Sequence, residues 1–239
     1  MPTYLYCLRS DGEEPPEGLT GVDGGVVRTI EAAGLVAWVS DVSEKVSATV
    51  DRVKAHDAVC GAALAVGETP LPVRFGQVFR DDAAAASELH SHDTELRTRL
   101  ARIAGCVELR IIVSAGCDPV SDTSAAKMRQ QPPGDSETPR EEDGPGTAFL
   151  KRLARQGRAD LAREVACEDV RHAVRSAAKS LIVGQHPCES SRGVSFFPVL
   201  IRRADVDAFR AALAEMLIFK ATGLSVLGPF APYSFAGDA

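Results

Sequence analysis

The chain has 239 residues, a net charge of −6 and 45% apolar residues. This composition is typical of a globular protein and too apolar for a disordered one, and the length suffices for two small domains. Basic and acidic residues are mixed along most of the chain and form no basic stripe, which argues against nucleic-acid binding.

The N-terminal residues lack the charged leader and apolar core of a signal peptide. The longest apolar stretches, such as residues 35–39 and 195–201, have the length of strands, so we expect no membrane span and a cytoplasmic protein. The six cysteines form no C-x-x-C pair and no Cys/His cluster with zinc-ligand spacing. We therefore expect six free thiols in a reducing compartment and no bound metal.

The first part of the chain, residues 1–115, is expected to form a small α+β domain. Its expected strands are short apolar runs between turn residues, at 4–8, 26–30, 35–39, 71–79 and 107–113. Apolar residues at helical spacing predict one helix from Val50 to Val66, and Asp81 can cap a second whose apolar face runs from Leu89 to Ile103. Strands covered by two helices suggest a ferredoxin-like layer, which the strand at 107–113 closes.

Residues 116–146 differ in composition from both neighbouring parts. This stretch is rich in proline and carries the charge run Arg140-Glu141-Glu142-Asp143, with almost no apolar residues. We expect a flexible linker or a long surface loop.

The last part, residues 147–239, is expected to form a second small α+β domain. It comprises a long helix at 149–183, a strand at 194–201, a helix capped by Asp205 and a last strand at 224–230. Acidic and basic residues alternate along the long helix, as is typical of a solvated face.

No motif of a common enzyme class is present: the sequence lacks a phosphate-binding loop, a dinucleotide-binding glycine turn and a nucleophile elbow. His56 and Asp57 are adjacent, but neighbouring residues on a helix point apart, so the aspartate is badly placed to orient the imidazole. We therefore expect no catalytic, cofactor-binding or metal-binding residues. An enzyme would need His56 or Cys60 in a cleft with a second polar group.

Arg74 lies in an otherwise apolar segment, and a buried guanidinium must be paired. One interpretation is a structural ion pair with Glu108 that fixes two strands. The other is a contact, beside Phe75, for a partner or an anionic ligand, since the planar fork of arginine suits either role.

The aromatic residues near the C-terminus also allow two interpretations. Phe230, Tyr233 and Phe235 either fold back to complete a core or form an exposed anchor for a partner protein. Pro229 and Pro232 would stiffen this tail and lower the entropy lost on docking.

Several segments together resemble the F/L-type gas vesicle protein family (GvpF/GvpL). They are Tyr4-Leu5-Tyr6, residues 34–42 (GLVAWVSDV), His56, residues 71–79 (LPVRFGQVF), residues 105–110 around Val107-Glu108, and residues 228–235 (GPFAPYSF). The resemblance covers nearly the whole chain except the expected linker, and residues 71–79 are its most specific part.

The resemblance implies two α+β domains, the first a variant ferredoxin-like fold, and a role in building gas vesicles, the gas-filled protein shells that give cells buoyancy. It implies an accessory or minor structural protein that contacts the small hydrophobic shell protein, and no catalytic residues. Our candidate contacts for such a partner are Arg74, Phe75, Phe230, Tyr233 and Phe235. The alternative is a small-molecule-binding regulatory module of ferredoxin-like type, in which Arg74 meets an anionic ligand.

Overall fold

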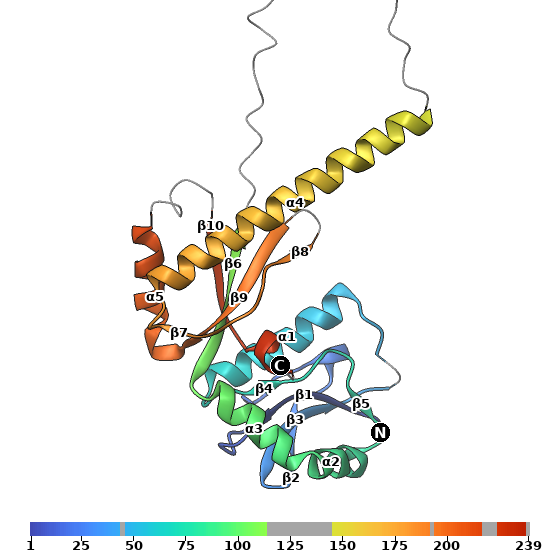
Figure 1. Ribbon diagram of the computed structural model, residues 1–239. Coiled ribbons are helices and arrows are strands. Elements are labelled where there is room, and N and C mark those ends of the chain that lie inside the picture. Colours follow the sequence, from blue (N-terminus) through green and yellow to red (C-terminus); the bar gives the residue numbers. More distant parts are fainter. Residues whose placement is uncertain (44–45, 114–144, 192–193, 217–223, 238–239) are drawn as a thin grey trace, which may run out of the picture.

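Two antiparallel sheets, each covered by helices, form the fold in a computed structural model (Figure 1). The structure describes residues 1–43, 46–113, 145–191, 194–216 and 224–237. The α+β class expected from the sequence is confirmed. Most of the expected linker, residues 116–144, lies outside the described residues, and the limits of the two expected domains stay a prediction.

The first sheet has the strand order β2-β3-β1-β4, with β5 also pairing with β1. Its strands are β1 (Thr3–Arg9), β2 (Arg28–Ala32), β3 (Leu35–Asp41), β4 (Leu71–Pro72) and β5 (Val78–Phe79). The expected hairpin is present, and its turn uses Ala33 and Gly34, both at positive φ. All seven residues of β1 are buried, because helices cover the sheet on both faces.

The helices of this part are α1 (Val50–Ala65), α2 (Asp82–Ser91) and α3 (Asp93–Ile103). Asp81 caps α2 as predicted, since its side chain accepts a hydrogen bond from the backbone nitrogen of Ala84 at 2.8 Å. The prediction of one helix up to Ile103 is wrong, because the helix is interrupted at His92, between α2 and α3. There the side chains of Ser91 and His92 both bond to the carbonyl oxygen of Glu88 and compete with the helical backbone bonds.

The second sheet has the order β10-β6-β9-β7, with β8 paired to β9. Its strands are β6 (Cys106–Val113), β7 (Ile182–Gln185), β8 (Glu189–Ser191), β9 (Val194–Arg202) and β10 (Leu224–Phe230). The expectation that β6 closes the first layer is therefore wrong. In the first sheet, one side of β1 pairs with β3, and the other side pairs with β4 and β5. The strand β6 instead pairs with β9 along its whole length. The ferredoxin-like description of the first domain stays a prediction, and no α-helix separates β1 from β2.

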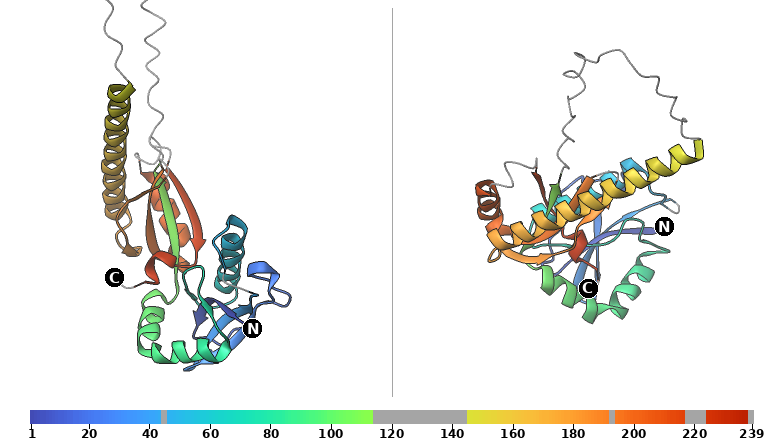
Figure 2. Two further views of the ribbon diagram at one scale, coloured as in Figure 1. Left: turned by 90° about the vertical axis from the view of Figure 1, so that its right-hand side faces the viewer. Right: turned by 45° about the horizontal axis from the view of Figure 1, so that its top comes forward.

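Two helices, α4 (Pro145–Ala177) and α5 (Val206–Glu215), cover one face of the second sheet (Figure 2). The predicted long helix ends at Ala177, earlier than expected, and the chain continues into β7. The N-terminal half of α4 extends beyond the sheet, and Leu153 and Leu161 are exposed there. No helix in the part of the chain that the structure describes is long and apolar enough to cross a membrane.

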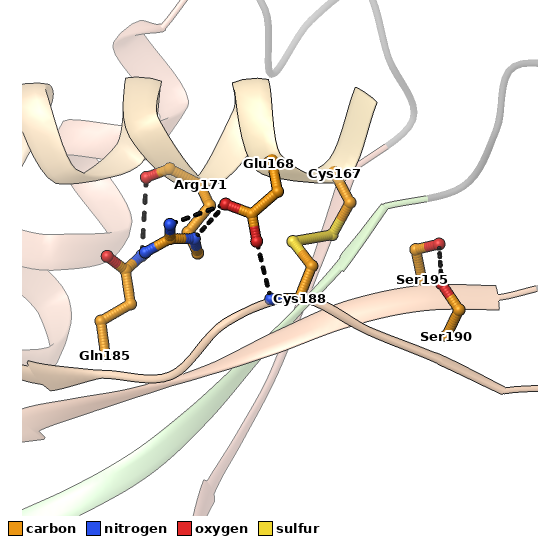
Figure 3. Close-up of a disulfide and its surroundings, with 7 residues drawn as sticks. All are labelled: Cys167, Glu168, Arg171, Gln185, Cys188, Ser190 and Ser195. Carbon is orange, nitrogen blue, oxygen red and sulfur yellow. Dashed lines mark hydrogen bonds and ion pairs between the residues drawn. A yellow bond between two sulfur atoms is a disulfide. The ribbon is translucent and has the colours of Figure 1, made fainter. Parts of the chain in front are cut away.

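A disulfide joins Cys167 of α4 to Cys188 in the turn between β7 and β8, with a Cα–Cα distance of 6.2 Å (Figure 3). The expectation of free thiols is wrong for this pair, because the fold brings together two cysteines that are 21 residues apart in the sequence. Glu168 strengthens the same connection, accepting from the backbone nitrogen of Cys188 at 3.0 Å and pairing with Arg171 at 2.6 Å. Cys7, Cys60 and Cys106 are free and buried, while Cys117 lies outside the described residues.

We expect the double substitution Cys167→Ser and Cys188→Ser to lower the free energy of unfolding by about 3 kcal/mol, because the disulfide restricts a loop of the unfolded chain. Urea unfolding of the two proteins without reductant measures this difference. The native protein in excess dithiothreitol is the control and should unfold like the double variant. Equal stability of all three samples would contradict a stabilising disulfide.

Candidate partner-binding site

A groove with a volume of about 600 Å³ lies between the segment that contains β4 and β5, the helices α2 and α3, and the C-terminal tail. Its floor is apolar and includes Leu5, Leu71 and Leu96, and its rim carries charged and polar side chains. Ligand-binding clefts commonly have volumes in this range and a similar mixture of surfaces. We take this groove as the candidate site.

Arg74 lines the groove, and its side chain is exposed. In β1, Cys7 pairs with Pro72 and Tyr4 pairs with Val78. The segment from Pro72 to Val78 is therefore longer than the part of β1 that it faces, and the residues around Arg74 bulge out of the sheet. The expected ion pair with Glu108 is wrong, because the Glu108 carboxylate is bonded to Arg110 and Ser234 instead. Among the described residues Arg74 has no ion-pair partner.

Phe75 follows Arg74 but lies on the other side of the segment, half-buried against Tyr4 and His56. The Tyr4 hydroxyl accepts from the backbone nitrogen of Gly76 at 3.0 Å and lies 2.9 Å from Nδ1 of His56. The Val73 carbonyl oxygen, 3.2 Å from Nε2, can only accept, so we assign the ring proton to Nε2 and the Tyr4 proton to the bond with Nδ1. Desolvation by burial raises the pKa of Tyr4 above its ordinary value.

His56 and Cys60 lie side by side in the interior, with the Cys60 sulfur 3.7 Å from Nε2 of the imidazole. Both side chains are buried, and neither lines the groove. The imidazole is held by Tyr4 and Val73, and the Cys60 thiol donates to the carbonyl oxygen of Tyr6 at 3.4 Å. Their polar atoms are thus used to join β1, α1 and the segment after β4.

The tail is fixed by Glu108, a fully buried residue of β6. Its carboxylate accepts from the backbone nitrogen of Ser234 at 2.8 Å, from the Ser234 hydroxyl at 3.1 Å and from Nε of Arg110 at 2.9 Å. Arg102 of α3 adds a hydrogen bond of 2.8 Å to the carbonyl oxygen of Phe235. These bonds connect the tail to elements of both layers.

The aromatic residues of the tail lie in three different settings. Phe235 is buried in the core between the two sheets, with its ring 4.5 Å from that of His186, so here the tail completes a core. Phe230 is half-buried under the guanidinium of Arg110, which lies 5.5 Å from the ring centroid. Tyr233 is half-buried and lies at the edge of the groove, while its ring packs inward, 6.1 Å from the ring of His56.

The structure therefore brings Arg74 and Tyr233 together at the groove, but not the other three candidate contacts, for which partner binding stays a prediction. Sequence analysis missed the contribution of Glu88 in α2, Glu95 in α3 and His92 at the break between them, which form part of the rim. No motif marks these residues. Their exposed positions on amphipathic helices resemble an ordinary solvated face.

We expect Glu108→Ala to lower the free energy of unfolding by about 2 kcal/mol, because it removes the acceptor for three hydrogen bonds and leaves the Ser234 amide without a partner. Chemical denaturation measures the loss, and hydrogen exchange should show faster exchange in residues 231–237. Ser234→Ala, which removes one of the three bonds, is the matched control and should cost about 1 kcal/mol. A tail that exchanges as slowly in Glu108→Ala as in the native protein would contradict this anchoring.

We expect removal of the hydroxyl groups of Tyr233 and Tyr4 to have different effects on the free energy of unfolding. Among the described residues, the buried Tyr233 hydroxyl has no hydrogen-bond partner, and burial raises its pKa. Tyr233→Phe should therefore leave the free energy of unfolding unchanged or raise it, whereas Tyr4→Phe should lower it by about 1–2 kcal/mol. Thermal unfolding of both variants tests the contrast, and an equal loss in both would contradict it.

Comparison with known proteins agrees with the architecture described above. The family model described as "Gas vesicle synthesis protein GvpL/GvpF" matches residues 2–237. Gas vesicle protein L1 of Halobacterium salinarum is 29% identical, with 98% of this chain and 90% of the relative covered. Gas vesicle protein L of a Streptomyces species is also 29% identical, with 99% and 93% covered.

Two solved structures have the same fold. The crystal structure of GvpF from Anabaena sp. PCC7120 has a TM-score of 0.70 at 20% identity, covering 100% of this chain and 97% of that one. GvpF from Microcystis aeruginosa has a TM-score of 0.67 at 19% identity, with 99% of both chains covered. The match to the family model over nearly the whole chain shows that this protein belongs to the GvpL/GvpF family of gas vesicle proteins.

Proposed function

We propose that this protein is an accessory or minor structural component of gas vesicle assembly that binds the small hydrophobic shell protein. It works by binding and not by catalysis. A shell protein with a strongly apolar face would aggregate before it is incorporated, and a bound partner that covers this face keeps it soluble. The matching family carries the description of gas vesicle synthesis, which supports this role.

The groove is the observation that carries the proposal. It offers an apolar floor at the junction of several elements, and polar and charged side chains surround it. Interfaces that bind protein segments commonly combine an apolar centre with a polar rim. Residues 71–79, the most specific part of the resemblance, contribute side chains to the groove, and residues 233 and 234 of the tail border it.

The protein acts in the cytoplasm, in association with the growing gas vesicle. Its partners are the shell protein and other gas vesicle proteins, without nucleic acid, a membrane or a cofactor. A second function, binding of a small anionic molecule, is favoured by one observation: the volume of the groove also suits a small ligand. A thermal shift with common anionic metabolites tests it, since a ligand of the native state raises its stability.

The shell-binding proposal is tested by expressing this chain and the shell protein in the same cells and purifying them together. The native protein should retain soluble shell protein. Gln77→Trp adds a bulky ring at the exposed rim of the groove. It should reduce the amount of retained shell protein at least about tenfold, which corresponds to a loss of about 1.4 kcal/mol in binding free energy.

Lys54→Trp is the matched control, because it adds the same ring on an exposed position of α1 outside the groove. This variant should retain as much shell protein as the native chain. If the native chain leaves the shell protein aggregated, the proposal fails. If both tryptophan variants retain it equally, binding does not use the groove.

A further inference from the structure

We propose that the groove recognises a partner segment that combines apolar side chains with one carboxylate, and that Arg74 binds this carboxylate. The inference rests on the proposed function, because it specifies the chemistry of the segment that enters the same groove. Arg74 would thus give the apolar groove a specificity for charge.

The charges around the groove are the first observation. Glu95 is paired with Arg99 one helical turn away, and Nδ1 of His92 lies 3.5 Å from a carboxylate oxygen of Glu88. Arg74 lines the same groove and has no ion-pair partner among the described residues. Its guanidinium is therefore a positive charge on this rim that is available to an incoming acidic group.

The backbone around Arg74 is the second observation. The residue before it, Val73, donates its amide to the carbonyl oxygen of Tyr6 at 3.0 Å, and the Leu5 amide donates to the carbonyl oxygen of Gln77 at 3.0 Å. Between these bonds the Gly76 amide is held by the Tyr4 hydroxyl, and Gly76 has a φ of 92°. The bulge is thus fixed on both sides, which places the base of the Arg74 side chain at the groove before any partner binds and lowers the cost of binding.

The chemistry of arginine decides the kind of occupant. A guanidinium binds a carboxylate through two parallel hydrogen bonds, and such a pair strengthens when apolar groups exclude water around it. The apolar floor beside Arg74 supplies these groups once a segment with Leu, Val or Ala side chains covers it. A segment with a lysine at the same position would meet an unfavourable like charge, so the groove discriminates by charge as well as by hydrophobicity.

Three soluble peptides test the inference with the full-length protein. They share a core of leucine, valine and alanine between glycine-serine flanks, and differ only in a central aspartate, asparagine or lysine. Fluorescence anisotropy should show the aspartate peptide binding at least about tenfold more tightly than the asparagine peptide. Arg74→Ala should remove this preference, and Arg74→Glu should shift it to the lysine peptide.

Arg80→Ala is the matched control, because Arg80 is also exposed but is paired with Asp81 and does not line the groove. It should keep the preference for aspartate. Equal binding of the aspartate and asparagine peptides, or a preference that survives Arg74→Ala, would overturn the inference. Stabilisation by decanoate in the absence of any peptide binding would also overturn it and assign the groove to a small carboxylate.

Co-purification with the shell protein separates this inference from the proposed function. If the native chain and Arg74→Glu retain the shell protein equally, the proposed function is supported and the proposed role of Arg74 is wrong. If the native chain does not retain the shell protein, the proposed function fails whatever the peptides show.

Discussion

The buried carboxylate of Glu108 is the interaction on which the arrangement of the site depends. A charged group without solvent must be paired, and Glu108 meets this requirement with the Ser234 amide and hydroxyl and with Arg110. These bonds hold the tail against β6, so that the tail borders the groove, the Tyr233 ring packs beside His56 and Phe235 fills the space between the sheets. One ionised side chain thus positions a wall of the groove and part of the core together.

The two sheets share this core and support the groove as one unit. Cys106 and Leu200 of the second sheet pack in the same cluster as Leu5 and Leu35 of the first. Thr69 adds a hydrogen bond of 2.7 Å to the carbonyl oxygen of Cys106. A groove at such a junction has walls from elements far apart in the sequence, and the packing behind them holds its shape without a partner.

An apolar groove also exposes a protein to association with itself, so its rim matters. Charged side chains of α2 and α3 lie around the floor, and Glu88 and Glu95 each lie beside a basic side chain four residues further along the chain. A polar rim of this kind limits the exposed apolar area while leaving the centre open for a partner. Such a surface is compatible with the proposed binding of a hydrophobic partner.

The sequence by itself determined the α+β class, most strands, the Asp81 cap and the resemblance to a gas vesicle family, because these follow from local patterns of apolar residues, turns and motifs. Only the tertiary structure decided that β6 belongs to the second sheet, that Glu108 pairs with Ser234 and Arg110 instead of Arg74, and that Cys167 meets Cys188. Local patterns cannot determine these contacts, since an apolar strand can pair within either sheet. A side chain's partner depends on which distant segment the packing places beside it.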